Sequence, residues 1–123
     1  MKKSDTVFLI GLIILSILTS FVLVFHGMNI IMAGWAPGSD MLFAYVSTAY
    51  GLANIAILSV AWSSRESWSS AASALIILCF LGVFIMDRVL TGMQGALEIA
   101  GILILCVVLW CNWLAVKKVV ERP

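Results

Sequence analysis

Four long apolar stretches dominate this sequence, and each is long enough to cross a lipid bilayer as a helix. They cover about residues 7–31, 41–62, 71–89 and 93–116. At about 1.5 Å of rise per residue, roughly 20 residues span the roughly 30 Å hydrocarbon core of a bilayer. Charged residues make up only 11% of the chain, against about 25% in soluble domains. The sequence therefore predicts an all-α, integral membrane four-helix bundle that forms a single membrane domain over residues 1–123.

The basic residues indicate how the bundle lies in the membrane. Six of the seven Lys and Arg residues precede the first stretch, follow the last one or lie in the second connection; the exception is Arg88. With four spans, these three regions share one side of the membrane. Because Lys and Arg favour the cytoplasmic side, we expect both termini to be cytoplasmic. The net charge of only +1 makes nucleic acid an unsuitable partner.

Polar side chains from distant parts of the sequence should meet in the outer half of this bundle. An ionised side chain in hydrocarbon costs on the order of 3 kcal/mol, so Arg88 and Glu98 must be paired, hydrated or neutralised. Gln94 and Glu98 are four residues apart and should face inward. The predicted ligand-binding or partner-binding site consists of His26, Asn29, Asp40, Tyr50, Asp87, Arg88, Gln94 and Glu98.

Two interpretations of this polar cluster remain open. Arg88 and Glu98 could form a structural pair that pins the hairpin of the third and fourth helices, or the cluster could line a pocket open to the outer side. His26 could be an interfacial hydrogen-bonding group or a metal ligand with Asp40, Asp87 and Glu98. No His-x-x-x-His or Glu-x-x-His pair is present, so we expect no metal site, and no cofactor is identified.

Small and polar residues recur at helical spacing on two of the stretches. The face of the first helix consists of Ser16, Thr19, Ser20, Leu23, His26 and Gly27, and that of the second consists of Ser47, Tyr50, Gly51 and Asn54. A carboxamide finds no hydrogen-bond partner in lipid, so the face with Asn54 should pack against protein. Close helix approach is also permitted by Gly51, Gly82, Gly92, Gly95 and Gly101, which favours a homo-oligomer or a larger membrane complex besides contact with membrane lipid.

The order of these features resembles the DoxX-like group of small four-helix bacterial membrane proteins. The resemblance is carried by Phe25-His26-Gly27, by Tyr50-Gly51-Leu52-Ala53, and by Asp87-Arg88 through Gly92 to Leu97-Glu98. It differs at Ile30, near which family members often have a Lys, and at Asn54, near which they often have an acidic residue. The resemblance implies a multi-pass protein of a bacterial inner (plasma) membrane, in some cases associated with a quinone-linked oxidoreductase or another membrane complex.

The sequence is compatible with three functions. The sequence contains no nucleophile–base pair and no nucleotide-binding loop, which favours a non-enzymatic role. The leading hypothesis is a small inner-membrane subunit or binding module whose outer polar cluster holds a small molecule or a partner protein. The alternatives are a proton-coupled small-solute transporter acting as a homo-oligomer, and a quinone-binding accessory subunit of a membrane oxidoreductase.

Overall fold

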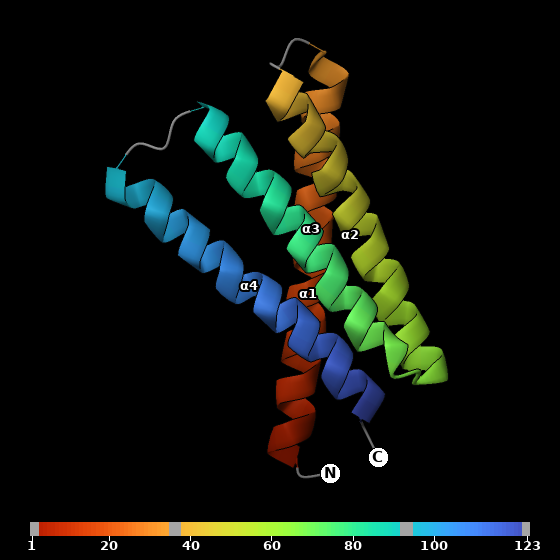
Figure 1. Ribbon diagram of the computed structural model, residues 1–123. Coiled ribbons are helices and arrows are strands. Elements are labelled where there is room, and N and C mark those ends of the chain that lie inside the picture. Colours follow the sequence, from red (N-terminus) through yellow and green to blue (C-terminus); the bar gives the residue numbers. More distant parts are fainter. Residues whose placement is uncertain (1–2, 35–37, 92–94, 122–123) are drawn as a thin grey trace.

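Four helices make up the fold. The computed structural model describes residues 3–34, 38–91 and 95–121, with all of their side chains except those of 38–40, 89–91 and 95–98. The helices are α1 (Lys3–Ala33), α2 (Gly38–Ser64), α3 (Trp68–Thr91) and α4 (Gly95–Glu121) (Figure 1). Each coincides with a predicted stretch and is long and apolar enough to span a membrane. The predicted all-α four-helix bundle is confirmed, and the chain is a multi-pass membrane protein.

The helices run further than the apolar stretches that predict them. Helix α1 begins at Lys3 rather than at residue 7, and α4 continues to Glu121 rather than ending at residue 116. The apolar pattern marks only the part of a helix that lies in hydrocarbon. The last turns of α4 contain the charged residues Lys117, Lys118 and Glu121. The ammonium of Lys117 lies 5.1 Å from the centre of the Trp113 ring, an attractive cation–aromatic arrangement.

Two helices end with a residue in the left-handed backbone conformation. Gly34, with φ of 72°, follows α1 and donates its N–H to the Ile30 carbonyl at 3.3 Å. Arg65, with φ of 55°, follows α2 and donates to the Ala61 carbonyl at 3.1 Å. Both bonds satisfy a carbonyl that the last helical turn would otherwise leave unpaired. They fix where the first two spans stop.

The helices form two antiparallel pairs. Helices α2 and α4 pack against each other across the bundle, and each also contacts both α1 and α3. Both described chain ends lie at one end of the molecule, while the α1–α2 and α3–α4 connections lie at the other (Figure 1). Toward the connection end, the α3–α4 pair leans away from the α1–α2 pair (Figure 1). The two pairs therefore meet most closely toward the chain ends.

Glycines bring α1 and α2 into very close contact. A Cβ atom on Gly51 would lie 2.6 Å from a Val24 methyl group and 2.7 Å from the Ser20 carbonyl oxygen. A Cβ on Gly27 would lie 2.5 Å from the Ala44 carbonyl oxygen and would also overlap the Thr48 hydroxyl. Only glycine fits at these two positions, as is common where membrane helices pack backbone to backbone.

The buried apolar side chains form two clusters. The cluster nearer the chain ends comprises Leu9, Leu58, Ala61, Val116 and Val119, which joins α1, α2 and α4. The second cluster is largely aromatic and joins α2, α3 and α4 through Phe43, Tyr50, Ile77, Phe80 and Leu109. Two members of this second cluster, Phe43 and Phe80, also line a cavity between the α1–α2 and α3–α4 pairs.

The outer surface of the bundle is apolar. Phe8, Val22 and Leu78 expose 52%, 64% and 67% of their surface, and many other large apolar side chains are similarly exposed. A contiguous apolar surface of this extent is typical of a protein that contacts lipid. The predicted contact with membrane lipid follows from the four spans.

Candidate binding site

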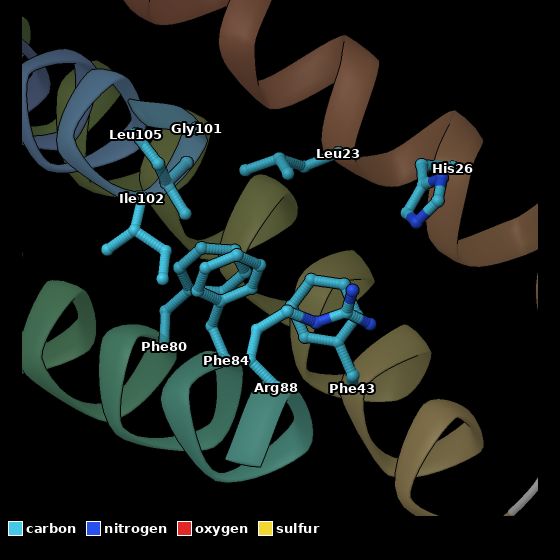
Figure 2. A pocket seen from close by; sticks show the side chains of 9 residues that line it. All are labelled: Leu23, His26, Phe43, Phe80, Phe84, Arg88, Gly101, Ile102 and Leu105. Carbon is cyan, nitrogen blue, oxygen red and sulfur yellow. The ribbon is translucent and has the colours of Figure 1, made fainter. Parts of the chain in front are cut away.

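A cavity of about 350 Å³ lies between the two helix pairs at the connection end of the bundle. Pockets of roughly 300–1,000 Å³ commonly hold small molecules. All four helices contribute to it, as Figure 2 shows. His26 and Gly101, on opposite sides, are both exposed, so the cavity is open to its surroundings. Its lining residues are Leu23, His26, Phe43, Phe80, Phe84, Arg88, Gly101, Ile102 and Leu105.

Phenyl rings form one wall of the cavity. Phe80 and Phe84 are four residues apart on α3, so both rings lie on one face of that helix. The ring centre of Phe43, on α2, lies 5.7 Å from that of Phe80 and 5.4 Å from that of Phe84. Ring pairs at such distances and tilted angles attract each other beyond the effect of burial. The wall is therefore a fixed apolar surface.

The polar groups of the cavity lie together at one end of it. Arg88 extends from the last turns of α3 past Phe43, and the His26 ring faces it from α1 (Figure 2). The His26 ring meets Phe43 edge-on, with ring centres 6.1 Å apart. One end of the cavity thus offers nitrogen donors, and the rest offers hydrocarbon.

The charge of Arg88 is balanced by its neighbour in the sequence. An Nη atom of Arg88 donates to the Asp87 carboxylate at 2.9 Å. The Asp87 side chain is fully buried, whereas that of Arg88 keeps 32% of its surface exposed. Adjacent helical residues point in different directions, so Arg88 must fold back to make this contact. A buried carboxylate needs such a partner, because burial of an unpaired charge is costly.

A second polar group lies deeper, between α1 and α2. The Asn54 carboxamide donates to the hydroxyl oxygens of Ser16 and Ser20, each at 2.8 Å, and all three side chains are fully buried. Nearby, the Ser47 hydroxyl donates to the Leu23 carbonyl at 3.0 Å. We call Ser16, Ser20 and Asn54 the Asn54 cluster. It contains no group that titrates near neutral pH, so its role is to hold helices together.

A third polar contact ties α2 to α4 beneath the cavity. The Asn112 carboxamide donates to the Tyr50 hydroxyl at 3.0 Å. The Tyr50 ring also packs on Phe80, with ring centres 4.9 Å apart. Because Phe80 lines the cavity, this hydrogen bond supports the aromatic wall from below.

The predicted site residues fall into three groups. His26 and Arg88 line the same cavity, and Asp87 is bonded to Arg88. Tyr50 reaches the cavity only through Phe80, and Asn29 is exposed on α1 outside the cavity lining. The side chains of Asp40, Gln94 and Glu98 lie outside the described residues, and with them the predicted Arg88–Glu98 pair.

The apolar part of the site was not predicted from the sequence. Phe43, Phe80 and Phe84 form the aromatic wall, but Phe8, Phe21 and Phe25 occur in equally apolar stretches and are exposed on the lipid-facing surface. The four-residue spacing of Phe80 and Phe84 is the one available signal, but Phe21 and Phe25 have the same spacing and are exposed.

The fold and cavity define a class: a small four-span membrane protein with an open aromatic cavity and a buried polar cluster. Comparison of the chain with protein families, curated proteins and solved structures finds no match.

Proposed function

We propose that the protein is a non-enzymatic binding module of a bacterial inner membrane that holds an amphipathic small molecule in the cavity between its helix pairs. One observation carries the proposal: the cavity joins apolar and aromatic walls to a nitrogen-rich end formed by Arg88 and His26. A ligand of matching shape has an apolar body and a polar head. With both termini cytoplasmic, the cavity lies in the outer half of the bilayer.

Gly101 offers a direct test, because it lines the cavity and has free space around it. A Cβ atom added there would meet nothing within 4 Å, so a larger side chain can occupy the cavity without disturbing the helix packing. Gly82 is a matched control: it has equal free space, lies on the exposed surface of α3 and is not part of the cavity lining.

The first prediction is that Gly101→Leu removes a copurifying molecule. The wild type, Gly101→Leu and Gly82→Leu proteins are purified in mild detergent, and bound molecules are extracted and measured by mass spectrometry. The wild type and Gly82→Leu should retain the same amphipathic molecule, and Gly101→Leu should lose most of it because leucine fills its space. An identical set of molecules in all three proteins would remove the basis of the proposal.

The same three proteins separate the alternatives. A quinone among the extracted molecules would favour an accessory subunit of a membrane oxidoreductase. A copurifying protein that is retained by all three variants, without a bound small molecule, would favour a structural subunit. Proton-coupled flux in liposomes that Gly101→Leu abolishes would favour a transporter.

A further inference from the structure

An apolar groove of about 280 Å³ runs along the lipid-facing surface between α3 and α4. We call it the α3–α4 groove. Its lining residues extend from Ala74 to Leu81 on α3 and from Cys106 to Trp113 on α4, which is about two turns of each helix. On its rim, Leu78 and Trp110 expose 67% and 57% of their surface. The groove is therefore open to the surrounding bilayer along its length.

One end of the groove lies near the boundary between hydrocarbon and water. Helices α3 and α4 are antiparallel, so Ala74 and Trp113 mark the end that is nearer to the start of α3 and the finish of α4. Trp68, the first residue of α3, exposes 53% of its surface beyond this end. Tryptophan is enriched at membrane–water interfaces, because its ring is apolar and its N–H is polar.

Two lysines lie at this end of the groove. The Trp113 ring lines the groove, and the ammonium of Lys117 lies 5.1 Å from the centre of the same ring. Lys118 follows in the sequence and is exposed. Within the described ranges, neither lysine forms an ion pair. The nearby carboxylates of Glu66 and Glu121 are both on exposed residues, where water and salt screen their charge.

The combination of an apolar groove with an ammonium at its interfacial end matches the structure of a phospholipid. An acyl chain suits the hydrocarbon and indole walls, and a phosphate suits the ammonium of Lys117. Basic residues near the bilayer surface attract anionic lipids. A zwitterionic lipid carries an ammonium of its own, which the lysines repel, so the charge at this end favours an anionic head group.

We infer that the α3–α4 groove binds one acyl chain of an anionic phospholipid, whose phosphate lies at Lys117 and Lys118. The groove shares no lining residue with the cavity that contains Phe84 and Gly101. The inference is therefore independent of the proposed function, and each can fail without the other.

Two phospholipids with identical acyl chains test the inference. One is dioleoylphosphatidylglycerol, which is anionic, and the other is dioleoylphosphatidylcholine, which is zwitterionic. Binding of each is measured by native mass spectrometry of the detergent-solubilised protein. The wild type should bind the anionic lipid about tenfold more tightly, because each lysine contributes roughly fivefold and Glu121 opposes them in part.

Lysine variants test the head-group end of the site. The double substitution Lys117→Gln and Lys118→Gln should abolish the preference for the anionic lipid, and Lys117→Arg should retain it because the charge remains. Lys3→Gln is the matched control. It removes the same charge at the same end of the bundle, but it lies on α1, which packs on α2 and α4 and takes no part in the groove.

A second pair of variants tests the acyl-chain end. Ala74→Phe places a ring in the groove and should weaken binding of the anionic lipid about tenfold. Ala56→Phe is its control, since Ala56 is exposed on α2 and belongs to neither lining. Gly101→Leu, which fills the cavity, should leave the lipid preference unchanged. If Ala74→Phe does not fold, as judged by helicity and size-exclusion chromatography, the lysine variants decide alone.

Three results would overturn the inference. Equal affinity of the wild type for both lipids would show that the lysines select no head group. Equal losses in Lys3→Gln and in the double lysine variant would show a general effect of net charge. Loss of the anionic lipid in Gly101→Leu, with retention in Ala74→Phe, would place the lipid in the cavity instead of the groove.

Discussion

Asn54 shows how a single polar residue can organise a membrane helix pair. Its carboxamide is fully buried and bonds to two hydroxyls on α1. Lipid offers such a group no hydrogen-bond partner, so separation of α1 from α2 would leave it unsatisfied. Ser16 and Ser20 are one turn apart, and their joint contact with Asn54 fixes the register of the two helices.

The second prediction concerns the stability of this contact. Asn54→Ala should lower the free energy of unfolding by about 1 kcal/mol, because hydrogen bonds between membrane helices contribute modestly. The measurement is a titration with sodium dodecyl sulfate in mixed micelles, followed by helicity. Ser59→Ala is the control, since the exposed Ser59 hydroxyl bonds only within α2, to the Ile55 carbonyl. Equal loss of stability in both variants would contradict the role of the Asn54 cluster.

The residues of this cluster could be predicted from the sequence, but their contact could not. Ser16, Ser20 and Asn54 stand out as polar groups in apolar helices, and their spacing places each set on one helical face. Either face could have met any of the other helices. Arg88 illustrates the same limit, because a pattern of faces gives no sign that its side chain folds back on the adjacent Asp87.

At the scale of elements, α1 and α2 form one closely packed unit. Gly27 and Gly51 both lie where the two backbones nearly touch, and the Asn54 cluster bridges the same interface. Among the described glycines, Gly82 of α3 and Gly101 of α4 differ, because they are surrounded by free space. The closest packing therefore lies within the first helix pair, and the cavity lies between the pairs.

The third prediction tests this difference between glycines. Gly51→Ala should destabilise the protein by about 1–3 kcal/mol, because the added methyl group overlaps Val24 and the α1 backbone. Gly82→Ala meets no atom and replaces glycine in a helix, so it should be neutral or stabilising by at most about 1 kcal/mol. Detergent titration measures both. A similar effect in the two variants would show that the α1–α2 contact is looser than the structure indicates.

The four helices could be predicted because apolar length alone determines whether a segment spans a bilayer. Their ends could be placed only approximately, since Lys117 and Lys118 continue α4 beyond its apolar part. The cavity could not be predicted, because it depends on the angle between the α1–α2 pair and the α3–α4 pair. No single segment encodes that angle.

For the whole molecule, the fourth prediction concerns orientation. Both chain ends lie at one end of the bundle, together with the connection that contains Arg65 (Figure 1). The concentration of basic residues there predicts that this end is cytoplasmic. A C-terminal green fluorescent protein fusion expressed in bacteria should fluoresce, and an alkaline phosphatase fusion at the same site should be inactive.

A fusion after residue 92 provides the matched control for this experiment. It follows three spans instead of four, so alkaline phosphatase attached there should be active. The opposite pattern of activities would reverse the orientation and place the cavity in the cytoplasmic half of the bilayer.

The unequal lengths of the helices have a consequence for the surrounding bilayer. Helix α1 has 31 residues and is about 46 Å long, whereas α3 has 24 residues and is about 36 Å long. A helix longer than the hydrocarbon thickness accommodates the mismatch by tilting. Because α2 is held against α1, the two helices must tilt together. We therefore expect the width of the gap between the helix pairs, and with it binding at the proposed site, to depend on the chain length of the surrounding lipid.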